Sequence, residues 1–169
     1  DIKRIVSILP TTDGQFSNEK AEDLISHRLQ TFNTQIELLW LATAYSLPDI
    51  ENILGDLEEA GARIYQESNK KLILHIVCNK PLQYRASHFV IDNIEWTPET
   101  AFKTMLVSHI GIMPLINTEF SRGKGGFKII QYMAAAMPAV ASAVGINEEI
   151  IDDRKTGFLI GSKYSHTWS

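Results

Sequence analysis

Short apolar segments of strand length recur along this chain, and amphipathic segments separate them. The clearest run, Ile36 to Ala42, is almost continuously apolar, which is typical of a strand that is covered on both faces of a parallel sheet. Strands that alternate with helices favour an α/β fold with right-handed crossovers. We therefore predict a Rossmann-like, three-layer α/β/α domain with a mostly parallel sheet. The further strands are expected at residues 72–77, 88–96 (one or two short strands), 110–113, 139–143 and 157–160.

Cap and proline signals place the expected helices between these strands. Pro48 begins one continuous helix whose apolar stripe faces inward. Residues 97–99 combine a threonine cap, a proline and an acid, and they predict a helix that begins at Pro98. Another helix is expected from Gly126 or Phe127 to about Ala136, and Asn147 is predicted to cap a short one. The helix after Pro48 carries acids that we expect on a solvated surface: Asp49, Glu51, Asp56, Glu58 and Glu59.

The composition indicates one soluble domain. The chain has 169 residues, enough for a single core, and 44% of them are hydrophobic and 21% charged, which excludes a disordered or collagen-like chain. A net charge of −4 disfavours a broad nucleic-acid footprint, and no apolar run reaches the roughly 20 residues of a membrane span. A single cysteine, Cys78, excludes an internal disulfide and a Cys-rich zinc site. It fits a reducing compartment, so a cytoplasmic location is expected.

One loop carries most of the candidate chemistry. Residues 117–128 follow a predicted strand, so they lie at the carboxyl edge of the expected sheet, where α/β folds bind ligands. Three glycines let the backbone approach a ligand, and the next helix offers unpaired N–H groups and the positive end of its dipole. Arg122, Lys124 and Lys128 add positive charge. Although 20 residues of the chain are acidic, none lies between Phe120 and Asn147. These features predict an anion site that suits phosphate.

Other interpretations of this loop stay open. A loop of glycine and lysine can also be a flexible surface turn with solvated side chains. No Ser or Thr follows Lys124, and the first strand is not followed by dinucleotide-binding glycines, so the ordinary ATPase and dehydrogenase patterns are absent. The five histidines show no metal-ligand spacing, so no metal is expected. RNA binding would need aromatic residues interleaved regularly with the cations, and this pattern is missing.

Several blocks in the second half of the chain resemble one family. They are Ile110–Leu115, Ser121–Ala134 and Pro138–Ser142, and the pattern continues through residues 144–159 without a gap. Together they are similar to the C-terminal, donor-binding domain of group 1 (family 4, GT-B) glycosyltransferases. The resemblance implies one half of a GT-B enzyme, which transfers a sugar from a nucleotide diphosphate sugar, usually with retention. It also implies that no essential metal or other cofactor takes part.

The resemblance assigns roles within the loop. Arg122 and Lys124 would be catalytic through their positive charge, and Glu119 and Ser121 are further candidates for contacts to the donor sugar. Typical members have two glutamates eight positions apart, where this chain has Gly123 and Gln131. Gln131 would then hydrogen-bond the ribose as a neutral group, and Lys124 or Glu119 would replace the first glutamate. The residues expected to bind the donor and its phosphates are Gly123, Gly125, Gly126, Phe127, Lys128 and Gln131.

The resemblance also divides the chain and implies its partners. Residues 1–35 would be a linker-like segment and a helix that packs on the domain, and residues 36–169 would bind the nucleotide sugar, with C-terminal helices missing. The N-terminal, acceptor-binding domain is absent, so we expect donor binding and little turnover from this chain alone. That domain would be a partner and could bring peripheral membrane association, whereas no nucleic acid is expected. The alternative is a non-catalytic nucleotide- or sugar-binding module, a degenerate glycosyltransferase subunit.

Overall fold

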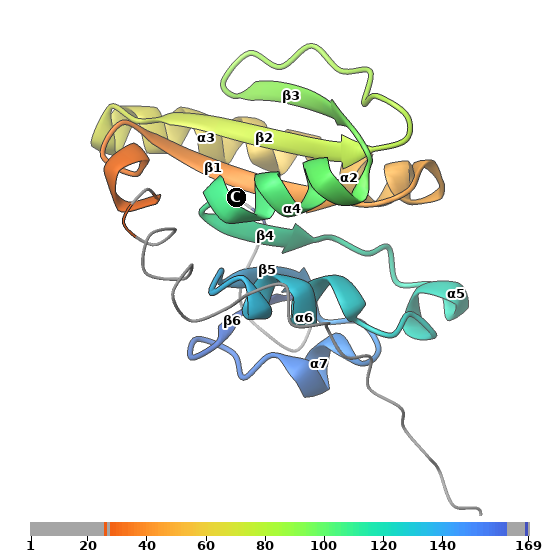
Figure 1. The fold of residues 1–169 in the computed structure, drawn as a ribbon. Helices are drawn as coiled ribbons and strands as arrows, with labels where there is room; N and C mark the ends of the chain where they lie inside the picture. Colours follow the sequence, from red (N-terminus) through yellow and green to blue (C-terminus); the bar gives the residue numbers. More distant parts are fainter. Residues whose placement is uncertain (1–25, 27, 162–167, 169) are drawn as a thin grey trace, which may run out of the picture.

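A six-stranded sheet, parallel throughout, forms the middle layer of the computed structural model, which describes residues 26, 28–161 and 168 (Figure 1). The strand order is β3-β2-β1-β4-β5-β6, so the chain changes direction across the sheet between β1 and β4. This topology confirms the predicted Rossmann-like α/β fold. The strands are β1 (Gln35–Leu41), β2 (Lys71–Cys78), β3 (Val90–Glu95), β4 (Ile110–Met113), β5 (Ala139–Ser142) and β6 (Gly157–Ile160).

Helices cover both faces of the sheet and complete the three layers (Figure 1). On one face lie α2 (Leu47–Glu51) and α3 (Leu54–Ser68), and on the other lie α4 (Pro98–Val107) and α6 (Phe127–Ala134). Both α4 and α6 begin where the sequence predicts. Short helical turns follow three of the strands at their carboxyl ends: η1 (Ala44–Ser46), α5 (Glu119–Arg122) and α7 (Asn147–Ile150).

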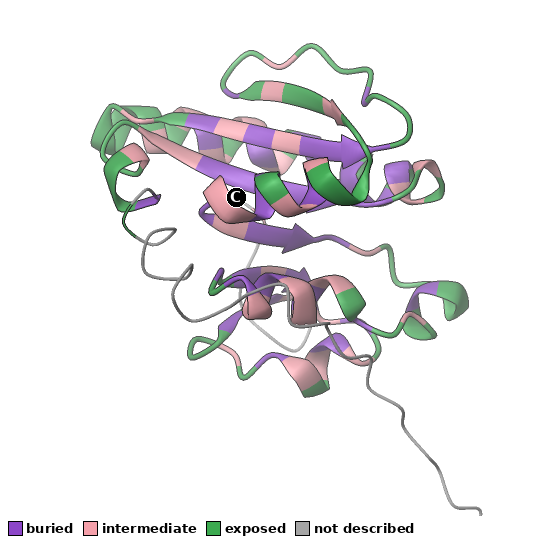
Figure 2. Cartoon of the chain, viewed as in Figure 1, coloured by how far each residue is buried: buried purple, intermediate pink, exposed green. Residues whose placement is uncertain are grey.

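Burial on both faces explains the continuous apolar run of β1. Leu38 and Trp40 pack against α2 and α3, whereas Leu39 and Leu41 pack against α4 and α6, because successive side chains of a strand point to opposite faces. All four side chains are buried, and Figure 2 shows the same burial along the centre of the sheet. Each stabilises the fold by about 1.5–3 kcal/mol relative to an exposed side chain.

Two predictions about helix ends are wrong. The segment after Pro48 forms two helices, because Ile53 leaves the helical conformation (φ −110°, ψ 7°), and this turn brings both Ile50 and Ile53 into the core. Asn147 is the first residue of α7, not its cap. Its side chain is buried and donates a hydrogen bond to the carbonyl of Ser142 at 3.0 Å, so it ties α7 to the end of β5.

A loop at residues 79–89, without a helix, connects β2 to β3. Leu82 and Phe89 of this loop are buried in the core on the α3 face. Asn93 of β3 holds the loop, since its amide accepts a hydrogen bond from the Leu82 N–H (2.8 Å) and donates one to the Leu82 carbonyl (3.2 Å). Glu58 of α3, which the sequence predicts on a solvated surface, accepts the N–H groups of residues 87 and 88.

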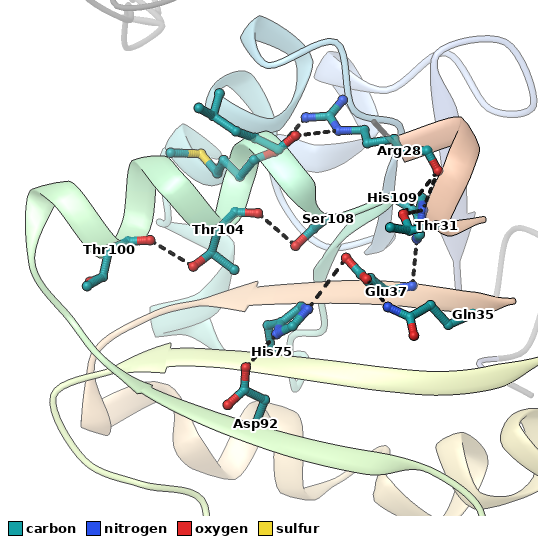
Figure 3. Close-up of polar contacts among 12 residues, drawn as sticks. Arg28, Thr31, Gln35, Glu37, His75, Asp92, Thr100, Thr104, Ser108 and His109 are labelled. Carbon is teal, nitrogen blue, oxygen red and sulfur yellow. Dashed lines mark hydrogen bonds and ion pairs between the residues drawn. The ribbon is translucent and has the colours of Figure 1, made fainter. Parts of the chain in front are cut away.

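Arg28 joins the C-terminal ends of α4 and α6, and Figure 3 shows its contacts with the end of α4. The predicted linker-like segment lies mostly outside the described residues, but this arginine near its end is buried. Its guanidinium donates to the carbonyls of Leu106 (3.1 Å) and Met105 in α4 and of Ala135 (2.9 Å) and Ala136 (3.1 Å) after α6. These carbonyls lack partners within their own helices, so Arg28 satisfies groups that would otherwise be buried without a hydrogen bond.

Substitution of Arg28 is therefore expected to be costly. We predict that Arg28→Ala lowers the free energy of unfolding by about 2–4 kcal/mol, because it leaves several buried carbonyls unpaired. Arg28→Lys restores only part of this loss, since an ammonium cannot span two helix ends as a planar fork does. Arg63→Ala is the control, because Arg63 is exposed and forms a surface ion pair with Glu67, and it should cost under about 0.5 kcal/mol in urea unfolding. Equal losses for Arg28→Ala and Arg63→Ala would contradict the prediction.

His75 links three strands on the α4 face of the sheet (Figure 3). Its Nδ1 lies 2.9 Å from Oδ2 of Asp92 on β3, and its Nε2 lies 3.7 Å from Oε2 of Glu37 on β1. Burial lowers the pKa of His75, but the carboxylates of Glu37 and Asp92 outweigh this effect and raise it above the ordinary value. Burial raises the pKa of Glu37, whereas His75 and Gln35 lower it, and the net pKa is below the ordinary value.

These shifts predict a stability that depends on pH. The charge of His75 stabilises the fold fully below the unfolded pKa of about 6.5, and this contribution is lost as the pH rises through the raised pKa. The contribution of Glu37 is lost as the pH falls through its lowered pKa. The difference in unfolding free energy between wild type and His75→Gln should therefore be largest near pH 5–6 and should shrink above about pH 7. Chemical unfolding at several pH values measures it, and a constant difference would contradict the assignment.

Candidate functional site

The predicted ligand loop lies at the carboxyl edge of the sheet, beside the point where the strand order changes direction. It follows β4, contains α5 and leads into α6 (Figure 1). Because β1 and β4 are parallel neighbours, the turn after β1 reaches the same edge. In parallel α/β sheets this crevice is where ligands bind. The fold therefore places the loop where the sequence predicts a site.

Tyr132 holds α6 against the two central strands. Its buried hydroxyl accepts the N–H of Leu41 in β1 (3.2 Å) and donates to the carbonyl of Ile112 in β4 (3.4 Å). Burial raises the pKa of Tyr132, so the phenol stays protonated. Gly111 makes room for the ring, because a Cβ at this position would lie 2.2 Å from a ring carbon. The first turn of α6 is thereby fixed at the edge of the sheet.

Gly126 begins α6 in a conformation that other residues rarely adopt. Its φ is +66°, in the left-handed region, and a Cβ would lie 2.3 Å from the Cδ1 of Ile150. Among the described residues, no side chain caps this helix end. The neighbouring Gly125 is exposed and its Cβ would meet open space. The backbone just before α6 is therefore exposed at Gly125, whereas Gly126 itself is buried, and an anion at this helix N-terminus would approach from the side of Gly125.

The two glycines allow a matched test of this conformation. We expect Gly126→Ala to lower the free energy of unfolding by about 1–3 kcal/mol, because it combines a left-handed φ with a steric clash. Gly125→Ala has neither problem and should change the stability by less than about 0.5 kcal/mol. Thermal or urea unfolding of both variants measures the difference. If Gly126→Ala were as stable as Gly125→Ala, the described turn would be wrong.

A cavity of about 440 Å³ opens between the end of β1, the start of α4 and the start of α6. Three of the predicted site residues line it, namely Phe127, Lys128 and Gln131. The remaining walls are apolar or aromatic except for Thr43: Leu41, Ala42, Trp96, Pro98, Ala101, Phe102 and Met105. The cavity thus combines mostly apolar and aromatic walls with one cation and one amide.

Lys128 is the cation of this cavity, and its environment makes its charge easy to lose. Burial and, to a smaller extent, the nearby charge of Lys124 lower its pKa, whereas Asp49 and Cys78 act in the opposite direction, and the resulting pKa is about 8. At neutral pH the side chain is mostly protonated. An anion that enters the cavity would stabilise the protonated form.

Lys124 lies next to the cavity in an ion pair that sequence reasoning missed. Its Nζ is 2.9 Å from Oδ2 of Asp49, in the first turn of α2, and 3.5 Å from the hydroxyl of Ser46. The sequence places Asp49 on a solvated surface, but its side chain is buried. The predicted order of strands and helices already places the start of the helix after β1 at the same edge of the sheet as the ligand loop. The sequence does not single out Asp49, because it is one of several acids in this helix.

The other predicted residues are spread along the loop. Arg122 is exposed, and its Nε donates to Oδ1 of Asn117 at 2.8 Å. Glu119 is also exposed, in the first turn of α5, and Gly123 is exposed with an ordinary φ of −84°. Ser121 is buried and bonded through its N–H to the Thr118 hydroxyl, the cap of α5. Their contacts with a sugar stay predictions.

A larger cavity lies elsewhere in the fold. Its volume is about 620 Å³, and it is formed by α3, the first residues of β2 and β3, and the end of the 79–89 loop. It contains none of the predicted site residues. Size alone therefore does not identify the site.

The described residues lack two further features, a metal-binding cluster and a membrane-spanning helix. No group of three or more His, Cys, Asp or Glu side chains within them could hold a metal ion. None of the helices in this part of the chain is both long enough and apolar enough to cross a membrane.

Comparison with known proteins gave one match. A family model described as glycosyl transferases group 1 matches residues 38–168, which is more than half of the chain. The matched range contains the whole ligand loop, the cavity and Asp49. The match confirms the resemblance seen in the sequence blocks. No curated protein matches the chain.

Proposed function

This chain belongs to the group 1 glycosyltransferases, and we propose that its cavity between β1, α4 and α6 binds the nucleoside diphosphate of a sugar donor. One observation carries the proposal. Two lysines, Lys124 and Lys128, lie close enough at the start of α6 for their charges to interact, and Lys128 lines a cavity whose other walls are mostly apolar. A partly buried cation at a helix N-terminus is a site for an anion.

The charges suit the chemistry of sugar transfer. When the bond between the anomeric carbon and the diphosphate breaks, negative charge develops on the leaving phosphate. Lys124, Lys128 and the N-terminal dipole of α6 would stabilise this charge, and Gly125 and Gly126 let the phosphates approach the backbone. Arg122 is exposed at the same edge and would add a further cation. The lysines would thus supply the positive charge that a metal ion supplies in other transferases.

The walls of the cavity suit the nucleoside. Trp96, Phe102 and Phe127 offer aromatic surface for a planar base. The amide of Gln131 can donate to one ribose hydroxyl and accept from the other. Trp96 lies in the two-residue connection, residues 96–97, between β3 and α4. The nucleoside would therefore lie in the cavity, with its diphosphate toward Lys128 and Lys124.

The sugar and the acceptor would lie outside this cavity. Glu119 and Arg122 are exposed on α5 and are the candidates for contacts on that side. Transfer with retention to an acceptor held by a second domain is the reaction that we propose. A second candidate, a module that binds the nucleotide sugar without transferring it, is favoured by Gly123 and Gln131, which stand where typical members have glutamates. Turnover measured beside binding separates the two.

Calorimetric titration with UDP, GDP and ADP tests the site. We expect one of them to bind and Lys128→Met to weaken that binding about tenfold or more, because a partly buried ion pair is lost. Lys103→Met is the control, because Lys103 is exposed on α4 and pairs with Glu99. Wild-type affinity should fall as the pH rises through about 8, where free Lys128 loses its proton. The proposal fails if none of the three nucleotides binds, or if both variants bind equally.

Chelation provides an independent check on the role of the lysines. Because Lys124 and Lys128 supply the positive charge, addition of EDTA should leave the affinity for the bound nucleotide unchanged within about twofold. Titration with and without added Mg²⁺ measures the same property. A large loss of affinity in EDTA would show that a metal ion carries the phosphate charge.

A further inference from the structure

Asp49 brings a buried carboxylate to the ligand loop, whose own acid, Glu119, is exposed. It comes from α2, 75 residues before Lys124 in the chain, and it is buried at the carboxyl edge of the sheet. Its Oδ2 accepts from the ammonium of Lys124 at 2.9 Å, and its Oδ1 accepts from the backbone N–H of Ile116 at 3.0 Å. A buried carboxylate is stable only with such partners.

These two hydrogen bonds hold the ligand loop at two points. Ile116 lies just after β4, and Lys124 lies two residues before the left-handed Gly126 that begins α6. The hydroxyl of Ser46, 3.5 Å from the Lys124 ammonium, is a weaker second partner. An ammonium has three protons, so Lys124 keeps donor capacity for a phosphate while its position is set by Asp49.

The carboxylate also balances the charge of the site. The titratable and charged groups that face Lys128 are Lys124 from the loop, Asp49 from α2 and Cys78 from the end of β2. The like charge of Lys124 disfavours the protonated form of Lys128, whereas the carboxylate of Asp49 favours it. Two cations in one partly buried site need such a counter-charge when no phosphate is bound.

We propose that Asp49 is the positioning residue of the phosphate site: its carboxylate fixes the ammonium of Lys124 and lets Lys124 and Lys128 stay charged together. The ligand side of this inference rests on the proposed function. The charge side concerns the free protein and can be tested without a ligand.

The first experiment is an NMR titration of the Lys128 side chain in the free protein. Asp49→Asn is the variant, because its amide oxygen can still accept from the Ile116 N–H while the charge is removed. The midpoint of the Lys128 titration should move to lower pH by about one unit in Asp49→Asn, and Asp49→Glu should restore it. Lys124→Met should move the midpoint to higher pH, and this opposite shift keeps the test valid if Asp49→Asn folds poorly. Identical midpoints in all variants would overturn the proposal.

The second experiment measures nucleotide affinity from pH 6 to pH 9 in the same variants. Asp49→Asn should bind about tenfold more weakly than wild type near pH 8 and within about threefold near pH 6, because Lys128 is protonated in both proteins at the lower pH. Asp152→Asn is the control, because it removes an exposed carboxylate that pairs with Lys155 away from the cavity, and it should stay within about twofold at every pH.

Two outcomes would overturn the positioning role while leaving the proposed function intact. An equal loss of affinity at every pH would mean that Asp49 supports only the loop backbone, and tighter binding at every pH would mean that it merely competes with phosphate for Lys124. If the wild type binds none of UDP, GDP or ADP, the proposed function fails. In that case the NMR midpoints alone decide whether Asp49 sets the charge of the lysines.

Discussion

The buried hydroxyl of Tyr132 is the contact on which the geometry of the site depends. It joins α6 to β1 through the Leu41 N–H and to β4 through the Ile112 carbonyl, at the place where the strand order changes direction. The ring can occupy this position only because residue 111 is glycine. With α6 held so closely, its N-terminal half places Lys128 and Gln131 along the cavity, and Gly126 turns the chain into the helix at the edge of the sheet.

Polar side chains from distant segments complete what apolar packing begins. Arg28 satisfies the carbonyls at the far ends of α4 and α6, so both helices are held at the end opposite the cavity. Asp49 holds the loop at the near end and supplies the counter-charge of its lysines. His75 of β2 and Glu37 of β1 link these two neighbouring strands of the sheet. The cavity therefore lies among elements whose ends are each tied to another part of the fold, which is the preorganisation that charge stabilisation requires.

Local patterns of the sequence carried much of this information. The apolar run of β1 predicted its burial on both faces, the cap at Thr97 predicted the start of α4, and the glycines before Phe127 predicted the start of α6. The absence of acids around Lys124 and Lys128 indicated an anion site. These features could be predicted because each depends on residues that are neighbours along the chain, and the family match supports the whole segment.

By itself, then, the sequence determined the α/β class, the order of the elements and the loop that carries the candidate chemistry. Only the tertiary structure decided that Asp49 is buried beside Lys124, that the helix after Pro48 breaks at Ile53, and that the charge of Lys128 is easily lost. The physical reason is common to all three. Each depends on burial or on charges contributed by segments that are distant in the sequence and that the parallel sheet brings together. The pattern of residues within one segment cannot predict which distant groups will contact it.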